Sequence, residues 1–282
     1  MINIDETTLQ VLAEPGRKAT STSYMWVFRR GDPHKPAIIY QYHPTRAGDV
    51  AKSFLGDFKG VIQTDGYSGY DFLDHREEVR HAGCLAHVRR KFMDLIKAQG
   101  KNRPSGSADQ ALAYIQQLYG LEKQARQREL STEAILTMRR EQARPIMEQF
   151  HQWLCKRSSQ TPPKGLLGKA ISYTLNQWDR LQVYLEEPLL TPDNNPAENA
   201  IRPFVLGRKN WLFAGTPQGA EASAMLFSLI ETARANNCEP YSYLRHIFAH
   251  LPNAQSVEDY EALLPWNINK LQILQLGMEV LD

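Results

Sequence analysis

The sequence predicts an α/β protein in which a mixed sheet is flanked by helices and interrupted by an all-helical segment. Runs of β-branched and aromatic residues, the residue types favoured in strands, dominate the first hundred residues. Up to about residue 190, the strand-forming residues give way to Gln, Glu, Arg, Leu and Ala, which favour helices. Apolar residues at helical spacing also occur after residue 220. A chain of 282 residues is long enough for one large domain or a domain with an insertion.

Three strands are predicted at the start of the chain, at residues 2–12, 23–29 and 37–42. The breaks between them carry turn-forming sequences, Glu14-Pro15-Gly16 and Gly31-Asp32-Pro33. Because short turns join neighbouring antiparallel strands, these three strands predict an antiparallel meander.

Helices and strands alternate after the meander. Apolar residues at helical spacing predict a helix over residues 46–58, and residues 60–64 read as a short buried strand that ends at Asp65. A weaker helical or looped piece at 70–73, a strand at 79–83 and a helix at 86–99 follow. The predicted order is therefore three antiparallel strands followed by parallel strands with helical crossovers.

The middle of the chain predicts an all-helical insertion. A polar linker at residues 100–106 precedes three predicted helices, near 112–121, at 132–153 with a break before Pro145, and at 165–184. Two more helices, 220–235 and 241–250, follow the insertion. We divide the chain into a first core part (1–100), a helical insertion (101–190), a second core part (191–255) and a tail (256–282), with no role assigned after Trp266.

Composition limits the functional classes. The net charge of +2 is too small to indicate nucleic-acid binding by bulk electrostatics, so such a role would depend on local basic clusters such as Arg89-Arg90-Lys91. A single cluster of this kind is more often a solvated helix face. Three widely spaced cysteines argue against a disulfide framework, and no secretory leader or membrane-spanning run is present. We expect a cytoplasmic protein without a membrane partner.

Residues 193–215 place an acidic residue at a helix start. Asn195 can cap a helix, Pro196 suits the first helical position, and Glu198 then falls at the third. Pro203 and Gly207 predict a short or kinked helix. On these residues alone, an ordinary capping role for Glu198 is favoured over catalysis.

Three cations follow Glu198 in the same stretch. Arg202 lies one turn beyond Glu198, and Arg208 and Lys209 come after it. A carboxylate that is surrounded by cations suggests chemistry beside phosphate groups.

Two further carboxylates occur where strands are predicted. Asp5 lies on the first strand and Asp65 ends the fourth, and strands one and four commonly lie side by side in this order of elements. With Glu198 they form an all-oxygen ligand set, which suits Mg²⁺ or Mn²⁺ and does not suit zinc. Taken separately, Asp5 could be a strand-edge charge and Asp65-Gly66 an ordinary turn.

Cys84 and His87 form a C-x-x-H pair. Zinc sites use such spacing but normally have four ligands, and the other cysteines lack matching histidines. A structural role, or one of supporting the neighbouring catalytic residues, is therefore favoured over a zinc site.

Four motifs carry a resemblance to a known family: IDETTLQVL, IQTDGYSGYD, GCLAHVRRKF and NNPAENAIRPFVLGRKNWLFAG. Over residues 1–255 the chain resembles the transposase of the insertion-sequence 66 family, a bacterial DDE transposase. The resemblance implies a ribonuclease-H-like core with Asp5, Asp65 and Glu198 as the catalytic and metal-binding triad. It also implies two Mg²⁺ or Mn²⁺ ions, and DNA strand cleavage followed by strand transfer.

The partners that the resemblance implies are transposon ends and target DNA, bound by a homo-oligomer associated with the bacterial nucleoid. Arg202, Arg208 and Lys209, together with Arg89 and Arg90, would contact phosphates. A non-catalytic DNA-binding or assembly remnant, or a ribonuclease-H-like nuclease, are the alternatives.

The sequence departs from the family pattern at its start. The proteins of the family that this chain resembles are longer, with a DNA-end-binding region ahead of the first catalytic aspartate. In this chain, four residues precede Asp5. We therefore expect a catalytic portion that binds DNA weakly and in a salt-sensitive manner.

Overall fold

The structure is a computed structural model that describes residues 1–100 and 104–269, so part of the predicted linker and most of the segment after Trp266 lie outside the described residues. The strands are β1 (Ile2–Val11), β2 (Thr22–Arg30), β3 (Ala37–His43), β4 (Gly60–Gln63), β5 (Val79–Ala82) and β6 (Phe213–Ala214). The longer helices are α1 (Gly48–Leu55), α2 (Leu85–Gln99), α3 (Ser107–Gln127), α5 (Arg144–Ser158), α6 (Leu166–Asn176), α8 (Asn195–Trp211), α9 (Pro217–Ala235) and α10 (Pro240–His250). Shorter helices are η1 (Ser68–His75), α4 (Thr132–Met138), α7 (Trp178–Gln182), η3 (Val183–Glu186), η4 (Leu251–Asn253) and α11 (Val257–Ala262), with a π-helical turn η2 (Arg139–Ala143).

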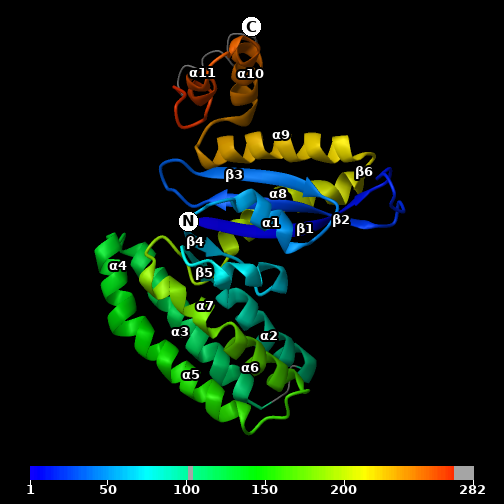
Figure 1. The fold of residues 1–282 in the computed structure, drawn as a ribbon. Helices are drawn as coiled ribbons and strands as arrows, with labels where there is room; N and C mark the ends of the chain where they lie inside the picture. Colours follow the sequence, from blue (N-terminus) through cyan, green and yellow to red (C-terminus); the bar gives the residue numbers. More distant parts are fainter. Residues whose placement is uncertain (101–103, 270–282) are drawn as a thin grey trace. The chain divides into compact units, whose positions relative to one another are not determined.

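The chain forms two compact units, each with its own core (Figure 1). Ile2–Val50 and the described residues from Pro196 onwards form the unit that we call the sheet unit. Ala51–Asn195, with Met1, form the helical unit. The sheet unit is therefore built from two segments that are distant in sequence.

The sheet of the sheet unit is mixed. β1 and β2 are antiparallel, with Asp5 opposite Val27, and β2 and β3 are antiparallel as well. β6 pairs parallel to β1, with Gln10 opposite Phe213. The predicted meander is confirmed, whereas the two-residue strand β6 was not predicted because it is too short to show a pattern.

Helix α8 packs on one face of this sheet. Leu9 and Val11 of β1 share a buried cluster with Ala200, Ile201 and Phe204 of α8. Because side chains alternate between the two faces of a strand, every second residue of β1 back from Val11 belongs to the same face.

Helix α9 lies along β3 (Figure 1). Its hydroxyl side chains form hydrogen bonds with main-chain groups of β3. The Thr232 hydroxyl accepts a hydrogen bond from Ile38 N at 2.9 Å and donates to Ile38 O at 2.9 Å. The Ser228 hydroxyl accepts a hydrogen bond from Tyr40 N at 2.7 Å. These hydroxyls occupy the main-chain groups through which another strand could pair with β3.

The helical unit contains the parallel pair β4–β5 and a helical core. Fully buried apolar residues of α2, α3, α5 and α6 form this core, among them Phe92, Ile115, Phe150 and Ile171. The elements from α3 to η3 are all helical, as the composition of this part of the chain predicted.

The predicted α/β class is confirmed, and two helices differ from the prediction in their continuity. The predicted helix over 165–184 is divided into α6 and α7 at Gln177. α8 continues without a break through Pro203 to Trp211, so the predicted short helix was wrong. Pro203 removes one hydrogen bond to the carbonyl of Asn199, and because Asn199 is exposed, water can satisfy that carbonyl.

Candidate active site

Asp5 lies in the middle of β1, half-buried, and its Oδ1 accepts a hydrogen bond from Glu6 N at 2.9 Å. It belongs to the same face of β1 as Thr7 and Leu9. Leu9 packs against Ile201 and Phe204 of α8, so that face is the one covered by α8. Asp5 is therefore held on the helix-covered face of a paired strand.

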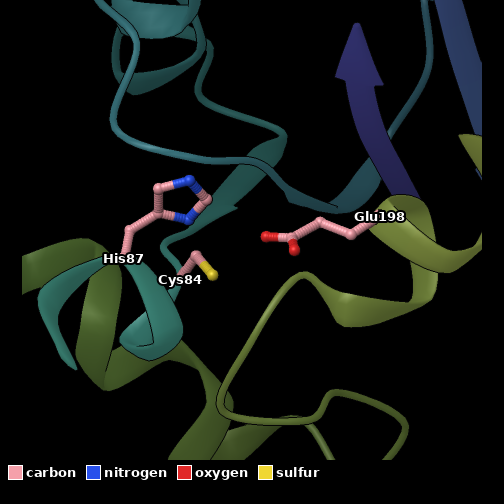
Figure 2. A group of neighbouring side chains, drawn as sticks. All are labelled: Cys84, His87 and Glu198. Carbon is pink, nitrogen blue, oxygen red and sulfur yellow. The ribbon is translucent and has the colours of Figure 1, made fainter. Parts of the chain in front are cut away.

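Glu198 lies in the first turn of α8, between two residues, Ala197 and Ala200, that pack on the sheet. The residue is half-buried, and its Oε1 is shielded from solvent. Within the sheet unit, Asp5 and Glu198 thus belong to β1 and to the helix that covers the Asp5 face. Figure 2 shows the Glu198 side chain leaving the start of α8.

The start of α8 is capped differently from the prediction. Asn195 is itself the first helical residue, and its N–H donates to Oδ1 of Asp193 at 3.1 Å. Glu198 consequently lies one position further into the helix than a capping box requires. The predicted N-cap position of Asn195 was therefore wrong, because Asn195 belongs to the helix and Asp193 accepts its N–H.

Asp65 follows β4 in the helical unit and begins a turn that leads into η1. Its Oδ1 accepts a hydrogen bond from Tyr67 N at 2.9 Å. A methyl group on Gly66 would lie 2.4 Å from the Tyr173 hydroxyl, so a larger residue after the aspartate would require the Tyr173 ring to move. Burial, followed by the Asp65 charge, raises the pKa of Tyr173 to about 12.

A buried hydrogen-bonded chain supports the residue before Asp65. The Thr64 hydroxyl lies 2.8 Å from Nε2 of His81, and His81 Nδ1 lies 2.7 Å from Asp74. Arg180 in turn binds the Asp74 carboxylate. Burial first, and Arg180 second, lower the pKa of His81 to about 4, although Asp74 opposes the shift. His81 is therefore neutral at physiological pH.

Cys84 anchors the loop that leads into α8. It precedes α2 and is buried, and its sulfur accepts a hydrogen bond from Asn194 N at 3.2 Å. His87, in the first turn of α2, offers a ring nitrogen within 4.8 Å of the Cys84 sulfur (Figure 2). Arg90 Nη1 lies 3.3 Å from Nε2 of His87.

The predicted phosphate-binding cations differ in their surroundings. Arg208 bonds to the side chain of Thr7 and to the carbonyl of Thr8, so it joins α8 to β1. Arg202 and Lys209 are exposed, and neither makes a hydrogen bond or ion pair with the residues that the structure describes. These two cations are therefore accessible to an anion.

Sequence reasoning missed several residues that hold the site. Gln63 donates to the carbonyls of Gly83 and Thr191 at 3.1 and 2.9 Å, and Asp193 accepts a hydrogen bond from Asn195 N at 3.1 Å. Thr64 and His81 were missed as well. Polar residues inside or just after a predicted buried strand were the only local signal for Gln63 and Thr64.

The fold and these residues define an α/β protein with a helical insertion, whose carboxylates are fixed on a strand, after a strand and at a helix start. The chain belongs to the family described as "Transposase IS66 family", which matches residues 1–222. Residues 228–266 match a second description, "IS66 C-terminal element".

Three curated relatives come from Sinorhizobium fredii (strain NBRC 101917 / NGR234). The uncharacterized protein y4jD is 33% identical over 96% of this chain and 54% of its own length. The uncharacterized proteins y4hP and y4qI are 30% and 31% identical over 93% of this chain, in each case across 50% of the relative. The chain thus spans about half the length of these relatives. No solved structure matches the chain.

Proposed function

We propose that this chain is the catalytic portion of a transposase, which cleaves DNA strands at the ends of a mobile element and joins them to target DNA. Asp5, Asp65 and Glu198 are the proposed catalytic residues. The placement of Asp5 and Glu198 supports this role most strongly, because one sits on a strand and the other on the helix that covers the same face of that strand. Membership of the family supports the reaction class.

The three carboxylates fit Mg²⁺ or Mn²⁺, and we propose two such ions. Carboxylate oxygens are the donors that these cations prefer. Asp65 has one oxygen fixed by Tyr67 N, while its second oxygen makes no hydrogen bond with the described residues. When bound, the ions would activate the attacking oxygen and stabilise the leaving oxygen of an in-line displacement.

The remaining side chains have separate roles in this proposal. Arg202 and Lys209, being exposed and without ion pairs among the described residues, hold DNA phosphates. Arg208 positions α8 against β1 through Thr7 and Thr8. Cys84 and His87 support the loop ahead of α8 and are not assigned to zinc.

Asp65→Asn tests the proposal, because the amide keeps the size of the side chain and removes its charge. We expect Mn²⁺-dependent nicking and joining of a labelled DNA duplex containing the element ends to fall by at least about 100-fold, the scale seen when charge stabilisation at a reacting centre is lost. Asp94→Asn, on the exposed side of α2, is the matched control and should retain activity.

Two results would contradict the proposal in different ways. Equal cleavage by Asp65→Asn and the parent protein would remove Asp65 from the mechanism. Hydrolysis without joining would favour a nuclease, and DNA binding without any metal-dependent nicking would favour an assembly module. The oligomer on DNA and the cytoplasmic location remain predictions. The structure adds that no described helix is both long and apolar enough to cross a bilayer.

A further inference from the structure

A cavity of about 510 Å³ lies in the helical unit, between α2, α3 and the loop before α8. The residues that line it include Arg89, Arg90, Met93, Lys97, Tyr119 and Asn195. Its volume lies within the range of about 300–1,000 Å³ that is typical of small-molecule sites. A cavity of this size can take one nucleotide but not a DNA duplex.

The α2 wall of the cavity is cationic. Arg90, Met93 and Lys97 recur at intervals of three and four residues, so they lie along one stripe of the helix, and Arg89 adjoins it. Arg89 is exposed and makes no hydrogen bond or ion pair with the described part of the chain. The nearest carboxylate to Lys97 is Asp94, at 3.7 Å, in an exposed pair of little strength. An arginine without an ion pair can therefore bind an incoming anion.

Among the described lining residues, Asp193 is the carboxylate, and one of its oxygens already accepts a main-chain hydrogen bond. Asp193 is buried, with 5% of its surface exposed. It accepts a hydrogen bond from Asn195 N at 3.1 Å, and its charge, after burial, raises the pKa of Tyr119. Asp193 thus holds the start of α8, and Arg89 on the α2 wall is the cation without an ion pair among the described lining residues.

We propose that this cavity binds a single unpaired nucleotide of a DNA strand. Arg89, Arg90 and Lys97 would hold the phosphate, and Met93 and Tyr119 would contact the sugar and base. Cationic grooves with aromatic side chains are how proteins bind single strands without reading their sequence. The assignment rests on the proposed function, because DNA is taken as the substrate. It extends that function by naming the strand form that the helical unit holds.

The test compares Arg89→Ala with Arg126→Ala in the full chain. Arg126 is an exposed arginine of α3 that does not line the cavity, so the control makes the same change of charge on the same unit. Binding of a fluorescent single-stranded oligothymidylate is measured at several salt concentrations. We expect Arg89→Ala to weaken binding at least fivefold and to reduce the salt slope by about 0.7, the contribution of one phosphate contact on a single strand. Arg126→Ala should change neither quantity appreciably.

Two further measurements identify the ligand. Thymidine 5′-monophosphate should displace the oligonucleotide at lower concentration than inorganic phosphate, because the sugar and base add contacts. An oligonucleotide containing 4-thiothymidine should cross-link under ultraviolet light to the peptides containing Met93 or Tyr119, and this cross-link should be lost in Arg89→Ala.

Several outcomes would overturn the assignment. Equal weakening of binding by Arg89→Ala and Arg126→Ala would indicate general charge attraction. A blunt duplex that competes as well as the single strand would exclude an unpaired nucleotide as the ligand. Preferential displacement of the oligonucleotide by an acidic peptide would indicate a protein ligand. The result is separable from the proposed function. If binding depends on Arg89 but the parent protein does not cleave DNA, the nucleotide site is supported and the catalytic role is rejected. If the parent protein cleaves DNA but Arg89→Ala binds as well as the parent, the catalytic role is supported and the nucleotide site is rejected.

Discussion

His81 shows how burial decides the charge of a single residue. Its ring is buried between Thr64 and Asp74, and a carboxylate at 2.7 Å would ordinarily favour the charged imidazolium. Arg180 already binds that carboxylate, so the cost of burying a second cation dominates and the pKa of His81 falls to about 4. The neutral ring can donate from Nδ1 to Asp74 and accept from Thr64.

This shift predicts a dependence of stability on pH. The ordinary pKa of histidine, about 6.5, applies to the unfolded chain, which therefore binds a proton before the folded protein does as the pH falls. The contribution of His81 is complete above about pH 6.5, decreases between pH 6.5 and about 4, and amounts to about 3 kcal/mol at most. Urea unfolding from pH 7.5 to pH 4 measures it.

His81→Gln is the matched variant, because glutamine can donate and accept as the neutral ring does but does not titrate in this range. The unfolding free energy of this variant should fall less than that of the parent between pH 6.5 and 4. Parallel curves for the two proteins would show that His81 titrates in the same way in the folded and unfolded states. His246, whose pKa is also lowered by burial, contributes to both proteins and cancels in the difference.

Arg139 is a second residue whose charge is buried and compensated. Only 1% of its surface is exposed, and it binds the Glu122 carboxylate at 2.8 Å and the carbonyls of Tyr184, Glu187 and Leu190. Arg139→Met would leave Glu122 buried without its partner, and we expect a loss of about 3–5 kcal/mol in unfolding free energy. Adding Glu122→Leu should recover most of it, as thermal and urea unfolding of the single and double variants would show. A double variant no more stable than Arg139→Met would indicate that the carbonyl contacts dominate.

At the scale of elements, α9 protects the open side of β3. The Thr232 hydroxyl both accepts from Ile38 N and donates to Ile38 O, which a methyl group cannot do. Thr232→Val keeps the shape of the side chain and leaves two buried main-chain groups unsatisfied, so we expect a loss of about 1–3 kcal/mol. Because an open strand edge can pair with another chain, the variant should also aggregate faster on heating, which light scattering detects.

Ser223→Ala serves as the control for this edge. Ser223 lies on the same helix, but its hydroxyl donates to Gly219 O of α9 itself, at 2.9 Å. The Ser223→Ala variant should have the same unfolding free energy as the parent protein and should aggregate at the same rate on heating. Comparable aggregation of both variants would mean that loss of a helix hydroxyl, rather than exposure of β3, causes the effect.

The elements that the sequence predicts well are those with local patterns. The meander follows from apolar alternation and turn residues, and the Asp5 strand and the Asp65 turn lie where those patterns placed them. The contacts of the site could not be predicted, because they join residues far apart in the chain. Arg208 was predicted to bind phosphate, but its guanidinium donates to Thr7 of β1. The role of Gln63 depends in the same way on the distant carbonyl of Thr191.

The short or kinked helix that was predicted at α8 shows a related limit. Proline removes one hydrogen bond wherever it occurs in a helix interior, but the consequence depends on whether water or another donor reaches the freed carbonyl. Asn199 is exposed, while Ala200, Ile201 and Phe204 pack on the sheet. Tertiary packing therefore keeps α8 continuous through Pro203, which a propensity scale cannot predict.

At the scale of the whole molecule, the two units differ in how the chain builds them. The helical unit comes almost entirely from one continuous segment, Ala51–Asn195, whereas the sheet unit needs Ile2–Val50 and the residues from Pro196 onwards. β1 pairs with β6, and β3 packs against α9, so each segment of the sheet unit completes the other. Independent folding is therefore expected for the continuous segment and not for either part of the sheet unit alone.

A fragment comprising residues 51–195 tests this difference. Its helical core is formed by residues of the segment itself. Hydrogen bonds from Gln63 to Thr191 O and from Asn194 N to the Cys84 sulfur join the end of the segment to its earlier part. We expect a helical circular dichroism spectrum and a cooperative thermal transition, which Arg139→Met should lower as it does in the full chain. Fragments 2–50 and 196–282, prepared separately, should show no cooperative transition, because neither supplies both sides of the Leu9–Phe204 core. A non-cooperative melt of fragment 51–195 would show that its core depends on the sheet unit, and cooperative folding of fragment 2–50 would show that the meander needs no covering helix.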